Sequence, residues 1–198
     1  MKVLSVLFLS MFATLGFAQH DHGGSVTNAK AAEISSHRIG RLVDTGKISE
    51  SFLLNMQQLD VVALPHNSAG VPAFQVNVKQ NLGQDGKQSE LKILLDMNGK
   101  FLSHVVLSEV STTQIEWPDS PVSELIESLL HYVTEQNPAG INIKPFNEKM
   151  KSLKVSKKSN SDGTVQAVMT IESSASTQKL EITLSSSGVV QNIGLINP

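Results

Sequence analysis

The residues best suited to chemistry cluster near the N-terminus, in the segment Gln19-His20-Asp21-His22. Two imidazoles and one carboxylate within three residues supply the nitrogen and oxygen ligands that copper, nickel and zinc accept in proteins. The pattern therefore predicts a copper or zinc site formed by His20, Asp21 and His22. The alternative is a solvated tail whose histidines bind nothing, because a mobile segment forms only a weak and unselective site.

The segment before this cluster has the pattern of a secretory signal peptide. Lys2 precedes an apolar run over residues 3–17, and the small residue Ala18 fits a cleavage site. We expect cleavage after Ala18, so that residues 1–18 are the signal peptide and residues 19–24 form a histidine-rich N-terminal tail. The alternative is an uncleaved membrane anchor, although the apolar run is shorter than the roughly 20 residues that span a bilayer.

Composition and charge exclude several classes of protein. Hydrophobic residues make up 40% of the chain and charged residues 17%, which is typical of a globular protein and not of a disordered one. The absence of cysteine from the sequence excludes disulfides, thiolate metal sites and cysteine catalysis. A formal charge of -2 lacks the positive excess that a phosphate backbone attracts. We therefore expect a periplasmic or secreted protein with no nucleic-acid partner and no stable membrane insertion after signal cleavage.

The chain contains an internal repeat. Residues 91–95, followed by Gly99, match residues 180–184, followed by Gly188, at an offset of 89 positions, from 91 to 180. In both copies aliphatic residues alternate before a turn glycine, which predicts a strand and a tight hairpin. Alternation elsewhere predicts further strands over residues 58–64, 73–80, 101–109, 152–157, 164–173 and 189–196.

A helix is expected before each set of strands. The apolar residues of 121–135 recur at helical spacing, with Ser120 as the N-cap and Pro121 at the first helical position. The other helix is expected over residues 27–44, with Gly46 just beyond its end.

These elements predict an α+β fold of two tandem units, each with one helix packed on a four-stranded antiparallel sheet. The first unit is expected over residues 25–110 and the second over 119–198, with a linker at 111–118. The simplest arrangement covers one face of each sheet with the helix and leaves the other face open.

The end of each unit resembles a known family. Antiparallel strands after a helix, ending in residues 179–184 with Gly188 and Val189-Val190, resemble the small exported PepSY-type domains. This resemblance implies a helix paired with a short sheet, and a binding or inhibitory module in place of an enzyme.

The first half of the chain also resembles an uncharacterised group of small proteobacterial exported proteins. The resemblance rests on the His/Asp-rich start, the helix and the step over residues 46–52, which here ends in Phe52 where that group is expected to have tryptophan. It implies an exported location and a similar fold.

The other histidines lack the short spacing of a zinc motif. Glu33 and His37 lie one turn apart and predict a surface ion pair on the first helix. His104 is expected on the open face of the first sheet, with Val105 and Leu107 on the opposite face. The lysines of residues 149–158 predict the solvent-exposed side of a strand, and the alternative is a patch for an anionic partner.

Motifs of catalysis are missing from the sequence, which has no G-x-S-x-G, phosphate-loop or dinucleotide pattern. We therefore expect an exported, non-enzymatic binding protein that recognises an envelope protein or peptide by an open sheet face or an edge strand. The alternative is a metal-handling protein that binds copper or zinc through His20, Asp21 and His22. A hydrolase with an unrecognised site is a third hypothesis.

Overall fold

The computed structural model describes residues 25–66, 68–81, 88–109, 121–135 and 140–197. In chain order its elements are α1 (Asn28–Asp44), α2 (Ser51–Leu54), β1 (Gln58–Ala63), β2 (Phe74–Asn81), β3 (Gln88–Leu95), β4 (Phe101–Ser108), α3 (Val122–Glu135), α4 (Lys144–Glu148), β5 (Met150–Ser159), β6 (Val165–Ser173), β7 (Lys179–Ser185) and β8 (Val190–Ile196). The two predicted helices and the eight predicted strands are confirmed, with ends that differ by a few residues. The predicted signal peptide, the tail 19–24 and the linker 111–118 lie outside the described residues.

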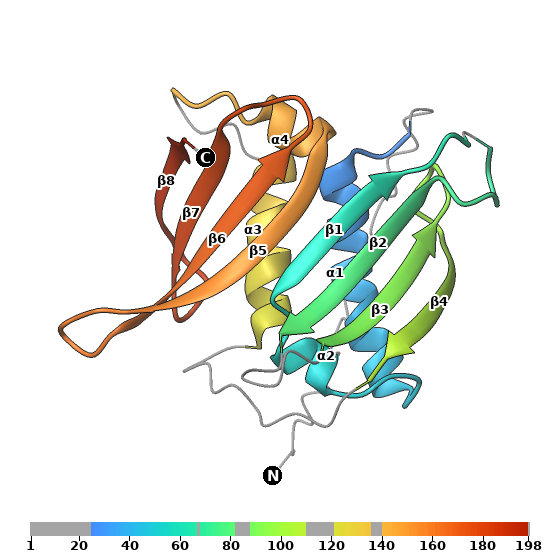
Figure 1. Cartoon of the computed structure of the whole chain (residues 1–198), viewed down its shortest axis with the longest axis horizontal. Helices are drawn as coiled ribbons and strands as arrows, with labels where there is room; N and C mark the ends of the chain where they lie inside the picture. Colours follow the sequence, from blue (N-terminus) through green and yellow to red (C-terminus); the bar gives the residue numbers. More distant parts are fainter. Residues whose placement is uncertain (1–24, 67, 82–87, 110–120, 136–139, 198) are drawn as a thin grey trace, which may run out of the picture.

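The eight strands form one antiparallel sheet in the order β4-β3-β2-β1-β5-β6-β7-β8 (Figure 1). The first strands of the two halves, β1 and β5, meet at its centre, where Leu59 lies opposite Leu153. The α+β class is confirmed, but the strands make a single sheet where the sequence predicts two. The physical reason is that β1 and β5 would otherwise be edges with unpaired backbone groups, and pairing with each other satisfies both.

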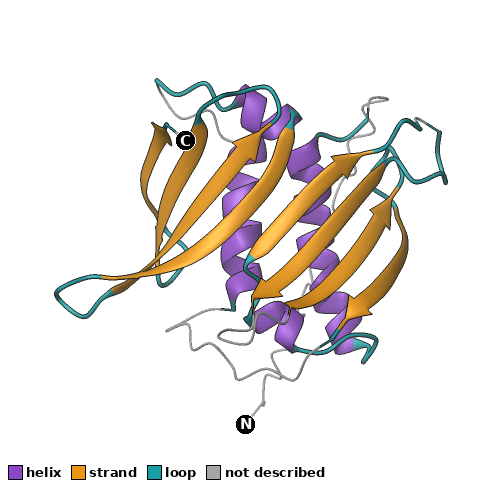
Figure 2. Ribbon diagram, in the orientation of Figure 1, coloured by secondary structure: helices purple, strands orange, loops and turns teal. Residues whose placement is uncertain are grey.

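The helices form a layer on one face of this sheet (Figure 2). α1 and α3 pack against each other in antiparallel directions, because Glu33 lies 3.5 Å from His131 while His37 lies 3.3 Å from Glu127. The predicted Glu33–His37 ion pair within α1 is therefore wrong, since each residue pairs across to α3. No helix in the described ranges is long and apolar enough to cross a membrane.

Local sequence explains where α1 begins and ends. The Thr27 side chain accepts a hydrogen bond from the Lys30 N–H at 3.1 Å, as an N-cap does. After the helix, Gly46 adopts a φ of 64°, which a residue without a Cβ reaches at no steric cost. The Lys47 N–H then donates to the Leu42 carbonyl at 2.9 Å, which closes the last turn. The predicted end of this helix at Gly46 is confirmed.

Each half places one phenylalanine in the core from a short helix. Phe52 in α2 and Phe146 in α4 are 0% and 1% exposed. Both are followed at the same spacing by a buried methionine and a buried leucine, at an offset of 94 positions, from 52 to 146. The matched residues are Phe52, Met56 and Leu59 in the first half and Phe146, Met150 and Leu153 in the second.

A bulge in β4 changes which side chains face the helices. The pairing of β4 with β3 shifts by one residue between Leu94 and Leu95. His104 consequently lies opposite the buried Ile93, on the helix-covered face, and Val105 is 49% exposed. The prediction that His104 occupies the open face is wrong, because the extra residue reverses the alternation that the sequence indicates.

Candidate binding groove on the open face of the sheet

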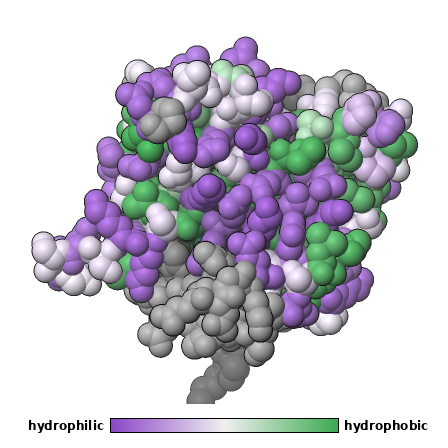
Figure 3. Space-filling model, viewed as in Figure 1, coloured by the Kyte–Doolittle hydropathy of each residue, from purple (hydrophilic) through white to green (hydrophobic). Residues whose placement is uncertain are grey.

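The face of the sheet turned away from the helices is covered by polar and charged side chains. In β1, for example, Asp60 points to this face between the buried Leu59 and Val61. Figure 3 shows the open face, with hydrophilic residues over its centre and hydrophobic ones toward its margins. This face is therefore built for contact with water or with a polar partner.

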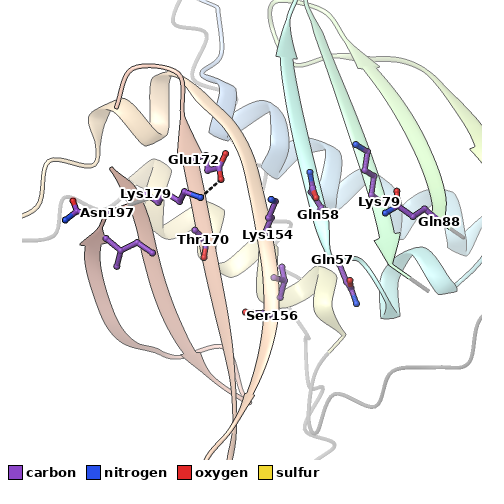
Figure 4. Close-up of a pocket in the computed structure, with 12 residues that line it drawn as sticks. Gln57, Gln58, Lys79, Gln88, Lys154, Ser156, Thr170, Glu172, Lys179 and Asn197 are labelled. Atoms are coloured by element: carbon purple, nitrogen blue, oxygen red, sulfur yellow. Dashed lines mark ion pairs between the residues drawn. The ribbon is translucent and has the colours of Figure 1, made fainter. Parts of the chain in front are cut away.

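A hollow of about 520 Å³ lies on the open face where β1 and β5 meet (Figure 4). Both halves of the chain contribute to its lining, from β3, β2 and β1 on one side and from β5 to the end of β8 on the other. We call it the seam groove. Its lining residues are Gln57, Gln58, Lys79, Gln88, Lys154, Val155, Ser156, Thr170, Glu172, Lys179, Ile196 and Asn197.

Two lysines of the seam groove are held in ion pairs. The Lys79 Nζ donates to the Asp60 Oδ2 at 2.9 Å, and the Lys179 Nζ lies 2.8 Å from the Glu172 Oε1. The hydrogen bond to Asp60 raises the pKa of Lys79 above its ordinary value. The hydrogen bond from Lys179 holds the pKa of Glu172 below its ordinary value. Each of these two lysines is therefore opposed by a carboxylate at hydrogen-bonding distance.

Lys154 differs from these two lysines. It lies in the middle of the groove, opposite Gln58 of β1 and Thr170 of β6. Within the described part of the chain, no carboxylate forms an ion pair with Lys154, although its charge helps to lower the pKa of Glu172. Ser152, two residues earlier in β5, has a buried hydroxyl without a hydrogen-bond partner among the described residues.

A larger hollow of about 960 Å³ lies beside α1 and the turn that follows β3. Its described lining holds one arginine, one lysine and one histidine against three carboxylates, so it has no positive excess. Several of these groups already stabilise the fold. Asp96 accepts hydrogen bonds from three backbone N–H groups, and His37 pairs with Glu127. The seam groove, whose described lining has three lysines and one glutamate, is the stronger candidate for a charged ligand.

The predicted metal ligands His20, Asp21 and His22 lie outside the described residues, so this site stays a prediction. In the ranges that the structure describes, no group of three or more His, Asp or Glu side chains is arranged to hold a metal ion. The sequence does not predict the seam groove, because the groove depends on the pairing of β1 with β5. The lysines of residues 149–158 were the available signal, and they are exposed as predicted.

Comparison of the chain with protein-family models, with curated proteins and with solved structures finds no match. The fold and the seam groove are therefore the features that bear on function.

Proposed function

We propose that the protein is a non-enzymatic binding protein that recognises a partner in the bacterial envelope through the open face of its sheet, at the seam groove. The observation that carries this proposal is the asymmetry of the sheet. Helices cover one face, while the other presents a polar groove lined by both halves of the chain. Both edge strands, β4 and β8, have register shifts against their neighbours, and such shifts disfavour the addition of a partner strand. The open face is therefore better supported than an edge.

We also propose that the two halves are copies of one PepSY-like unit, bounded by residues 25–110 and 119–198 and secreted or periplasmic after cleavage at Ala18. Each half contains a long helix, a short helix with a buried phenylalanine and a four-stranded meander, in the same order. The repeated spacing of phenylalanine, methionine and leucine supports a common origin. The resemblance to PepSY-type domains and the signal-peptide pattern support the exported, non-enzymatic assignment.

The proposal predicts that filling the groove abolishes partner capture. Thr170→Trp puts a bulky ring on the open face, whereas Lys144→Trp adds the same ring to α4, where Lys144 is 74% exposed. The immobilised mature chain and the Lys144→Trp variant are expected to retain the same proteins from an envelope extract, and the Thr170→Trp variant to lose them. Unchanged capture by Thr170→Trp, with a circular dichroism spectrum like that of the wild type, would contradict recognition by this face.

The alternative function is metal handling through His20, Asp21 and His22, and the observation that favours it is the density of ligands in this segment. Calorimetric titration of the chain starting at Gln19 with copper and zinc is then expected to show saturable binding. Replacing His20 and His22 by alanine removes the imidazole ligands and is expected to abolish it. Equal binding by the wild type and the double variant would refute this site.

A further inference from the structure

We propose that the occupant of the seam groove is an extended acidic peptide, which places a carboxylate on Lys154. This inference rests on the proposed function and adds the chemical class of the partner. It is carried by the charges, the hydrogen-bonding groups and the shape of the groove.

The charge of the groove is opposite to that of the whole chain. Its described lining residues include three lysines and one glutamate, whereas the chain carries a formal charge of -2. Lys179 already neutralises Glu172, and Asp60 neutralises Lys79. Among the described residues, Lys154 is thus the lysine of the groove without an ion-pair partner, and the excess positive charge of the lining is centred on it. An excess of one sign of charge in a concave surface concentrates ligands of the other sign, which here are anions.

The groups around Lys154 can complete the binding of a carboxylate. Gln58 and Thr170 flank it in the same cross-strand row, one on each side (Figure 4). An ammonium and a carboxylate form a charge-assisted hydrogen bond, which is stronger than a neutral one. The Gln58 amide nitrogen donates to the Asp60 Oδ1 at 2.7 Å, which leaves its second N–H. This N–H and the Thr170 hydroxyl supply further donors for the second carboxylate oxygen.

The rest of the lining favours a peptide over other anions. Gln57, Gln88 and Asn197 have side-chain amides, which donate and accept hydrogen bonds as peptide groups do. Among the described residues that line the groove, none is aromatic, so they supply no ring on which a nucleic-acid base could stack. The lining extends across the strands from β3 to the end of β8, which suits an elongated ligand better than a small ion.

Fluorescence anisotropy with labelled oligoglutamate, oligoglutamine and oligolysine tests this proposal on the full mature chain. Oligoglutamate is expected to bind most tightly. Lys154→Glu is expected to weaken its binding by about tenfold or more, because a charge-assisted hydrogen bond is replaced by repulsion. Lys154→Gln removes the charge while it keeps a polar side chain of similar length, and it is expected to weaken binding in the same direction.

Lys92→Glu is the matched control, since it makes the same charge change on the open face but outside the groove lining. Lys92 is three strand spacings from Lys154, roughly 14 Å, which exceeds the screening length of about 8 Å in physiological salt. Lys92→Glu is therefore expected to change the affinity for oligoglutamate by less than about threefold. Equal losses in Lys92→Glu and Lys154→Glu would show a general charge effect and overturn the proposal.

The remaining outcomes separate this inference from the proposed function. Equal affinity for the three peptides, or tight binding of polygalacturonate without binding of oligoglutamate, would overturn the acidic-peptide assignment. If Thr170→Trp still abolishes partner capture in either case, recognition by the open face stands and only the ligand class fails. If capture survives Thr170→Trp, the proposed function itself fails.

Discussion

Phe146→Ala is expected to lower the free energy of unfolding by about 4 kcal/mol. Phe146 is 1% exposed, and α4 brings it against β5 and β6. Truncation removes the buried ring and leaves a cavity that the surrounding core fills only in part. Urea unfolding followed by circular dichroism measures the loss. Phe146→Leu keeps most of the apolar volume and is expected to cost less than about 1.5 kcal/mol.

Phe52→Ala is the matched variant in the other half and is expected to have a similar effect, because Phe52 is also fully buried. The pair of variants tests whether the halves unfold together. β1 and β5 are hydrogen-bonded, and α1 packs against α3, so we expect one cooperative transition that either variant shifts. Two transitions, each moved by only one of the variants, would show that the halves fold independently.

Asp96→Ala is expected to lower the free energy of unfolding by about 3 kcal/mol. Asp96 is 2% exposed and follows β3. Its Oδ1 accepts hydrogen bonds from the Asn98 and Lys100 N–H groups, both at 2.9 Å, and its Oδ2 accepts one from the Gly70 N–H at 3.0 Å. The carboxylate thus ties two loops together, and truncation leaves all three donors without this acceptor. Thermal or urea unfolding measures the effect.

Stability near Asp96 is also expected to depend on pH. Burial acts to raise the pKa of Asp96, but the backbone N–H groups of Gly70, Lys100 and Asn98, together with the charge of Lys100, hold it below its ordinary value. A lowered carboxyl pKa stabilises the folded state above the ordinary pKa, and this contribution is lost as the pH falls through the folded-state pKa. Asp96→Asn keeps one acceptor oxygen, so we expect intermediate stability and a weaker loss in acid. A variant with wild-type stability at every pH would refute this role.

The sequence predicts much of the local structure correctly. The stripe of apolar residues in 121–135 defines α3, and alternation before Gly99 and Gly188 defines the two matching hairpins, because both patterns arise between near neighbours in the chain. Gly46 is placed correctly for the same reason, since the positive φ that ends α1 is a local requirement.

The bulge in β4 shows where a prediction from the local residue pattern is wrong. Alternation alone places His104 on the open face, but one extra residue opposite β3 turns it toward the helices. The predicted ion pair between Glu33 and His37 is wrong for a similar reason. A partner one turn away is visible in the sequence, and Glu33 does have one in Lys30. The contacts of Glu33 with His131 and of His37 with Glu127, in contrast, join α1 to α3.

The sequence itself thus determines the composition, the signal-peptide pattern, the helices, the strands and the turn glycines. Each of these depends on residues that lie close together in the chain. The tertiary structure alone decides that β1 pairs with β5, that both halves share one sheet, and that Lys154 lies beside Gln58 in the seam groove. These contacts join residues nearly a hundred positions apart. They form because pairing the two central strands satisfies their backbone groups and buries Leu59 against Leu153, a gain that no local pattern encodes.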